Sequence, residues 1–186
     1  MRKTTMLIAF SLLLACALDV SAKSKEEKQA EARKKADATL ARLYKAKPSA
    51  QAAIKKAAGY AVFNSSGAKI LIAGGGRGSG IAVDNATQKV TYMKMRELQA
   101  GLGMGVKKFS TIFIFETKKA FDDFANGGRE FGGQTTAAAK TGDGGGSLQG
   151  AASVSEGVWM YQLTDKGLAL EVTGKTTKYM KDGDLN

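Results

Sequence analysis

The sequence predicts an α+β fold: a strongly curved antiparallel β-sheet or small barrel-like core, with an N-terminal helical segment and one internal helix. Apolar residues recur at helical spacing across residues 23–47, and from Gly59 onward short β-branched and aromatic runs alternate with glycine or asparagine. The chain also holds 23 glycines, more than its turns need, and many lie within or beside the predicted strands. Because glycine weakens a strand, these positions indicate sharp bends, bulges or close backbone approaches, which a strongly curved sheet requires.

Residues 1–22 have the pattern of a removable export signal. Arg2 and Lys3 give a positive start, residues 6–18 are apolar and uncharged, and residues 20–22 (VSA) are suitable for cleavage. The apolar run is too short for a membrane span, which needs roughly 20 residues. We therefore expect an exported, periplasmic protein in three parts: a signal (1–22), a charged amphipathic helix (23–48) and one domain (49–186).

Cys16, the only cysteine of the chain, lies inside this signal and leaves two cleavage sites open. Residues 13–16 (LLAC) resemble a bacterial lipobox, whose cleavage would leave Cys16 as the lipidated first residue of a protein anchored to the outer membrane. Cleavage after Ala22 would instead release a chain without cysteine. Neither alternative allows an intramolecular disulfide, so the core must hold the domain together by itself.

The charged segment at 23–47 predicts an amphipathic helix that ends at Pro48. Its apolar positions are Ala32, Ala36, Leu40, Leu43 and Tyr44. Such a helix could lie on an anionic membrane, but alanine buries little area per residue. We therefore expect the helix to pack on the domain through residues 40–44.

The remaining elements follow in order along the domain. A short helix is predicted at 50–58, with Ser49 as its N-cap and Gly59 just past its end. A second helix is predicted at 118–126, with Thr117 as N-cap and glycines at its end. Strands are predicted at 60–64, 69–73, 80–84, 89–94, 108–116, 135–140, 147–153, 158–163 and 168–174, the last two forming a hairpin.

The residues that most catalytic and metal sites need are missing. The chain has no histidine, which removes the commonest general base near neutral pH and the commonest metal ligand. The glycine run at 74–80 does not match the dinucleotide-binding pattern, and the stretch at 169–176 lacks the first glycine of a P-loop. We expect a protein that is not an enzyme and carries no cofactor and no metal.

The charge balance indicates the class of partner. The chain has a formal net charge of +11, which favours association with nucleic acid, anionic lipid headgroups or acidic polymers. Export makes nucleic acid the least suitable of the three. A simpler interpretation, that the charge keeps an exported protein soluble, stays open.

Four blocks of the sequence together resemble the SYLF lipid-binding domain family. They are AIKKAAGYAVF (53–63), GGGRGSGIAV (74–83), GLGMGVKKFSTIFIFE (101–116) and VWMYQLTDKGLALEVTG (158–174). The resemblance implies a lipid-binding or membrane-surface-binding domain rather than an enzyme. The chain departs from the family at 92–98, where a tryptophan-containing block is usual. In the periplasm the ligand would be phosphatidylglycerol, cardiolipin or a phosphorylated glycolipid.

The basic residues beside the glycine runs are the candidate contacts for a lipid headgroup. Lys107 and Lys108 come first, because exposed backbone amides of the neighbouring glycines could add donors. Arg77 comes second, and Lys118 and Lys119 follow at a helix start. The predicted function is non-catalytic binding of anionic headgroups or membrane surfaces through a basic, glycine-rich face. The alternative is a structural or interaction protein of the envelope that binds an acidic polymer or a partner protein.

Overall fold

The computed structural model describes residues 23–70, 73–100, 105–131, 148, 150–165, 167–168 and 175–186. For several residues at strand ends, Lys107 among them, it describes the backbone alone. The helices are α1 (Lys25–Ala46), α2 (Ser49–Lys56) and α3 (Lys118–Gly127). The strands are β1 (Gly59–Ile70), β2 (Ala73–Asp84), β3 (Val90–Ala100), β4 (Gly105–Phe115), β5 (Arg129–Phe131), β6 (Ala152–Ser155), β7 (Val158–Thr164), β8 (Gly167–Leu168) and β9 (Lys175–Lys181).

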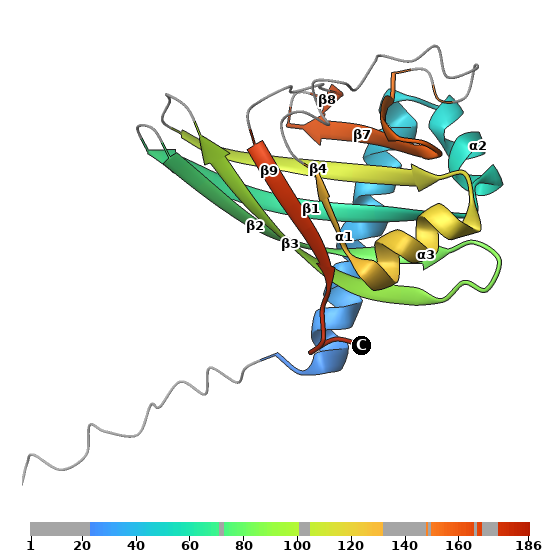
Figure 1. Cartoon of the computed structure of the whole chain (residues 1–186), viewed down its shortest axis with the longest axis horizontal. Coiled ribbons are helices and arrows are strands. Elements are labelled where there is room, and N and C mark those ends of the chain that lie inside the picture. The colour runs from blue at the N-terminus through green and yellow to red at the C-terminus, as the bar shows by residue number, and fades with distance from the viewer. Residues whose placement is uncertain are drawn as a thin grey trace, which may run out of the picture.

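One antiparallel sheet organises the described part of the chain. Its strand order is β5-β9-β3-β2-β1-β4-β7-β6, and β8 pairs with β7. The sheet curls strongly into a half-barrel, with α3 inside the curl and α1 on the opposite side (Figure 1). This confirms the predicted α+β fold with a strongly curved sheet.

The two faces of the sheet bury different cores. On the outer face, α1 and α2 pack on aliphatic residues such as Val62, Ile81 and Ile112. On the inner face, α3 closes an aromatic cluster made by Phe63, Phe113, Phe115, Phe121, Phe124 and Tyr179. Burial of the aromatic side chains on one face and of the aliphatic ones on the other stabilises the curl from both sides.

The helices begin and end largely where the sequence predicts. The Ser24 side chain accepts from the Glu27 amide and the Glu27 side chain accepts from the Ser24 amide, so a capping box starts α1. The residues predicted for its apolar face are buried, except for Tyr44, which is partly buried. Thr117 caps α3 as predicted, its hydroxyl accepting from the Ala120 amide at 3.2 Å.

Ser49 is not the N-cap of α2, contrary to the prediction. Pro48 already has helical backbone angles, so the helix takes its first turn from Pro48 and includes Ser49. The Ser49 hydroxyl is buried and has no hydrogen-bond partner among the described residues.

The strands are longer than predicted because the glycine run is part of one. The predicted strand at 69–73 is wrong: Lys69 and Ile70 end β1, and Ala73 begins β2. Residues 65–68, which have turn composition, pair with β2 on one side and β4 on the other. Pairing on both sides satisfies their backbone groups, which overrides their weak strand propensity.

The alternation of glycines in β2 follows from the two faces. Gly76, Gly78 and Gly80 lie on the inner face, while Arg77 and Ser79 lie on the outer face. A Cβ atom at Gly80 would lie 2.5 Å from the Phe63 ring, so a side chain there would collide with the aromatic cluster. The glycines therefore provide the close approach that the curl needs.

The C-terminal part is only partly described. β7 and the hairpin that it forms with β8 are as predicted, with Leu163 paired to Leu168. The predicted strand at 135–140 and most of that at 168–174 lie outside the described residues, as do Cys16 and the rest of the signal. The predicted strand at 147–153 is largely wrong: Leu148, Gly150 and Ala151 are not in a strand, and β6 begins only at Ala152. β5 and β9 were not predicted. Among the described residues, no helix is long and apolar enough to cross a membrane.

Candidate anion-binding groove

The outer face of the sheet changes from apolar to polar along its strands. Near α2 it carries the aliphatic core, but one row farther on Ser110, Asn64, Ser79 and Lys94 stand side by side on β4, β1, β2 and β3. The next row reads Lys108, Ser66, Arg77, Arg96 and Lys178 across β4, β1, β2, β3 and β9. Adjacent strands lie about 4.8 Å apart, so this second row forms a cationic band across the sheet.

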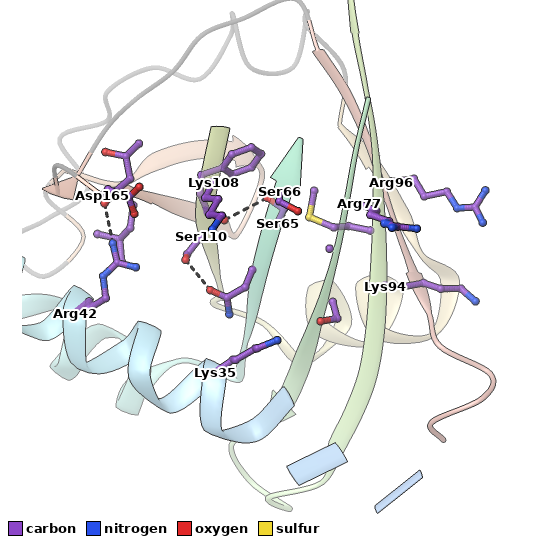
Figure 2. Close-up of a pocket in the computed structure, with 17 residues that line it drawn as sticks. Lys35, Arg42, Ser65, Ser66, Arg77, Lys94, Arg96, Lys108, Ser110 and Asp165 are labelled. Carbon is purple, nitrogen blue, oxygen red and sulfur yellow. Dashed lines mark hydrogen bonds between the residues drawn. The ribbon is translucent and has the colours of Figure 1, made fainter. Parts of the chain in front are cut away.

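A groove of about 740 Å³ lies between this polar part of the sheet and α1. We call it the basic groove, after its six cationic residues: Lys35, Arg42, Arg77, Lys94, Arg96 and Lys108. Asp165 is the one carboxylate among its lining residues in the described part of the chain. Figure 2 shows Lys35 and Arg42 extending from α1, with Lys108 and Arg77 coming from the strands.

The floor of the groove is a hydrogen-bonded polar cluster under α1. Asn64 Oδ1 accepts from Thr39 Oγ1 at 2.9 Å and from Ser110 Oγ at 2.7 Å (Figure 2 shows the second bond). Thr39 and Ser110 are only 3% and 4% exposed. Both hydroxyls donate to the Asn64 oxygen, and Asn64 itself lines the groove, so its amide is one of the polar groups that a ligand there would meet.

The cations differ in how firmly they are held. Arg42 Nη2 donates to the Thr164 carbonyl at 2.8 Å, which fixes this guanidinium at the groove mouth. Lys35 lies 2.7 Å from Glu31, and Lys94 lies 4.0 Å from Asp182. Hydrogen bonds from Lys23 and Lys35 lower the pKa of Glu31 to about 2, so this carboxylate stays ionised at any neutral pH.

Four cations of the groove have no anionic partner among the described residues. Arg42 donates to a carbonyl, and Arg77, Arg96 and Lys108 form no salt bridge in the described part of the chain. Like charges held close together repel one another, and an anionic ligand relieves that repulsion. The arrangement can bind anions through charge-assisted hydrogen bonds, and Asn64, Ser66 and Ser79 add neutral contacts for a ligand.

The structure brings together two of the five predicted headgroup contacts. Arg77 and Lys108 both pair in register with Ser66, on its two sides, and both line the basic groove. The backbone of Lys107 pairs with Gly67, and its side chain lies outside the described residues.

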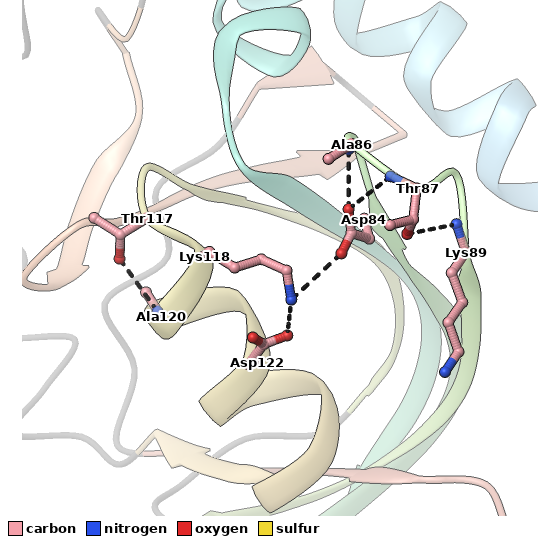
Figure 3. Close-up of polar contacts among 8 residues, drawn as sticks. All are labelled: Asp84, Ala86, Thr87, Lys89, Thr117, Lys118, Ala120 and Asp122. Carbon is pink, nitrogen blue, oxygen red and sulfur yellow. Dashed lines mark hydrogen bonds and ion pairs between the residues drawn. The ribbon is translucent and has the colours of Figure 1, made fainter.

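Lys118 and Lys119 lie apart from the residues that line the groove. Lys118 Nζ bridges Asp122 and the nearly buried Asp84, the latter at 3.4 Å (Figure 3). Lys119 pairs with Asp123 of the same helix at 2.6 Å and is largely exposed. Asp84 also accepts from the backbone amides of Thr87 and Ala86, so it joins the β2–β3 turn to the start of α3. Lys118 therefore links α3 to the end of β2, whereas Lys119 forms only a surface pair within the helix.

Sequence reasoning missed Lys35, Arg42, Lys94, Arg96 and the polar floor. Lys35 and Arg42 are seven residues apart, which places them two turns apart on one side of α1, toward the strands. Lys94 and Arg96 are two positions apart in a strand and therefore share a face. These spacings are visible in the sequence, but only the register shows that β3 lies beside the Arg77 strand.

The chain was compared with protein families and with curated proteins. No family model matches the chain. A curated protein named Beta cell expansion factor A, from Aeromonas veronii, is 36% identical over 150 residues. The match covers 81% of this chain but 56% of that relative, so the chain spans little more than half of the relative's length.

Proposed function

We propose that this protein is a non-catalytic cell-envelope protein that binds anionic lipid headgroups at a membrane surface through the basic groove. The observation that supports it is the basic groove, which has a polar floor and is lined, among the described residues, by six cations and one carboxylate. Its volume of about 740 Å³ is in the range of small-ligand sites, roughly 300–1,000 Å³, and is sufficient for a headgroup.

Further support comes from the sequence. The resemblance to the SYLF lipid-binding domain and the export signal at 1–22 both suit a peripheral protein of the periplasm. If the site at Cys16 is used, a lipid anchor adds to the membrane affinity. In this proposal α1 is a wall of the groove rather than a membrane-lying helix, because its apolar residues are buried against the sheet.

Vesicle flotation with charge-reversed variants tests the proposal. The variant carries Arg77→Glu and Lys108→Glu, and the vesicles are phosphatidylcholine with or without phosphatidylglycerol. Each cation near an anionic surface contributes about 1 kcal/mol, so the double reversal should weaken binding by about 2–4 kcal/mol, or roughly 30-fold or more. Binding of the wild type should also weaken as salt rises, because exposed charges are screened over about 10 Å at 0.1 M.

A matched control is available on α2. Lys55→Glu with Lys56→Glu makes the same change in net charge at exposed positions outside the groove. Equal weakening by both pairs would show that net charge alone drives binding, against the proposal. Failure of the wild type to float with anionic vesicles, combined with groove-dependent binding to an acidic polysaccharide, would establish the alternative of a polymer-binding envelope protein.

A further inference from the structure

Helix α1 covers the outer face of the sheet only part-way along β3. Tyr92 is buried under Arg33, whose Nε donates to the Tyr92 hydroxyl at 2.7 Å and whose guanidinium lies 5.5 Å from the ring centre. The next outward positions on β3 are Lys94, Arg96 and Leu98. Figure 2 shows Lys94 and Arg96 pointing away from Arg42 and Ser110, at the open margin of the groove.

Leu98 is the most exposed large apolar side chain among the described residues. It is 72% exposed, and its register neighbours are Gly75, which has no side chain, and Thr176. One row away, Arg96 lies between Arg77 and Lys178. We call this surface the β3 stripe; it consists of Arg77, Lys94, Arg96, Leu98 and Lys178.

We infer that the β3 stripe is the surface that rests on an anionic bilayer, with Leu98 inserted among the headgroups. This inference rests on the proposed function and adds an orientation to it. A bilayer interface offers anionic groups directly above an apolar layer, which matches a leucine at the end of a cationic row. Two carboxylates lie nearby, Asp182 at 4.0 Å from Lys94 and Glu130 opposite Lys178, and they leave the stripe with a net positive charge.

The stripe is continuous with the basic groove. Arg77, Lys94 and Arg96 belong to both, so the groove opens beside the surface that contacts the bilayer. A headgroup can then reach the polar floor while its acyl chains stay in the membrane. The docked α1 does not need to leave the sheet in this orientation.

A single-tryptophan reporter tests whether Leu98 enters the bilayer. Trp159 is the only tryptophan, so Trp159→Phe with Leu98→Trp in the full chain reports on position 98 alone. With vesicles of phosphatidylcholine and phosphatidylglycerol, the emission should shift to shorter wavelength and be quenched by lipid brominated on its acyl chains. Lys119→Trp in the same background, at an exposed position on α3, should show neither effect.

A second measurement keeps the inference falsifiable if the reporter disturbs the stripe. Loss of leucine burial should weaken vesicle partition of Leu98→Asp roughly 10- to 100-fold. The matched variant Leu168→Asp, at the other exposed leucine of the described residues, should partition like the wild type. Leu98→Asp partitioning like the wild type, while Arg77→Glu with Lys108→Glu does not, would overturn the inference and leave the proposed function intact. Unchanged emission at position 98 on vesicles that carry the protein would do the same and assign the stripe to a protein partner.

Discussion

At the residue scale, two glycines of β2 have a definite steric role. Gly78 and Gly80 lie where the inner face is most crowded: a Cβ at Gly78 would lie 2.9 Å from the Ser65 Cβ, and one at Gly80 would lie 2.3 Å from the Val62 carbonyl oxygen. Backbone and an aromatic ring cannot yield as the tip of a flexible side chain can. The curl of the sheet therefore depends on glycine at positions 78 and 80, because its side chain is a single hydrogen atom.

Gly80→Ala should destabilise the fold by about 1–3 kcal/mol, the usual cost of overpacking a core. Urea unfolding followed by circular dichroism measures the change. Gly127→Ala is the matched control, since a Cβ there meets nothing within 4 Å in the structure. An unfolding midpoint for Gly80→Ala equal to that of the wild type would contradict the steric account of the glycine alternation.

At the element scale, α3 is tied to the β2–β3 turn by one carboxylate. Asp84 is 6% exposed and accepts from the Thr87 and Ala86 amides and from Lys118 (Figure 3). The Thr87 amide, followed by the Ala86 amide and Lys118, holds the pKa of Asp84 below its ordinary value, although desolvation opposes them. The position of α3 over the aromatic cluster thus depends on the ionised carboxylate of Asp84.

Lowering the pH should weaken the interactions by which Asp84 connects α3 to the β2–β3 turn. Because the pKa of Asp84 is lower in the folded state, its stabilisation is complete above the ordinary aspartate pKa of about 3.9 and is lost as pH falls below that value. Asp84→Asn should therefore lose less stability than the wild type between pH 6 and pH 3, as measured by urea unfolding at each pH. Comparing the wild type with the variant cancels the contribution of the other carboxylates. An equal loss of unfolding free energy in the two proteins would argue against a stabilising role for Asp84.

At the scale of the whole molecule, two apolar clusters form the core of the described residues. The chain has no histidine and one cysteine, and the described residues hold no cluster of three acidic or cysteine residues suited to a metal. Two apolar clusters on opposite faces of one sheet supply the burial instead.

A chelator or a reductant should leave the unfolding curve of the protein unchanged. Thermal unfolding with each reagent, compared with untreated protein, measures this directly. A lower midpoint with the chelator would reveal a structural metal, and one with the reductant would reveal a disulfide between chains.

The sequence predicted the fold class well because helical periodicity, caps and strand runs are local signals. The extent of the strands was less predictable, since residues 65–68 become strand only through neighbours that are remote in sequence. The same holds for the groove. Arg77 and Lys108 could be chosen because glycines flank them in the sequence. Arg96 joins them only through the β2–β3 register. Asn64 matters only because the Thr39 and Ser110 hydroxyls both donate to it.

The alternation of inward and outward positions along β2 also separates the residues that natural variation can change from those that it must keep. A side chain at position 78 or 80 would collide with backbone atoms, and one at position 76 would require its neighbours to shift slightly. Arg77 and Ser79 face outward at exposed positions, so their side chains can be exchanged at little cost to folding. Ligand preference can therefore change, or be redesigned, at two alternate positions of one strand while the architecture stays constant.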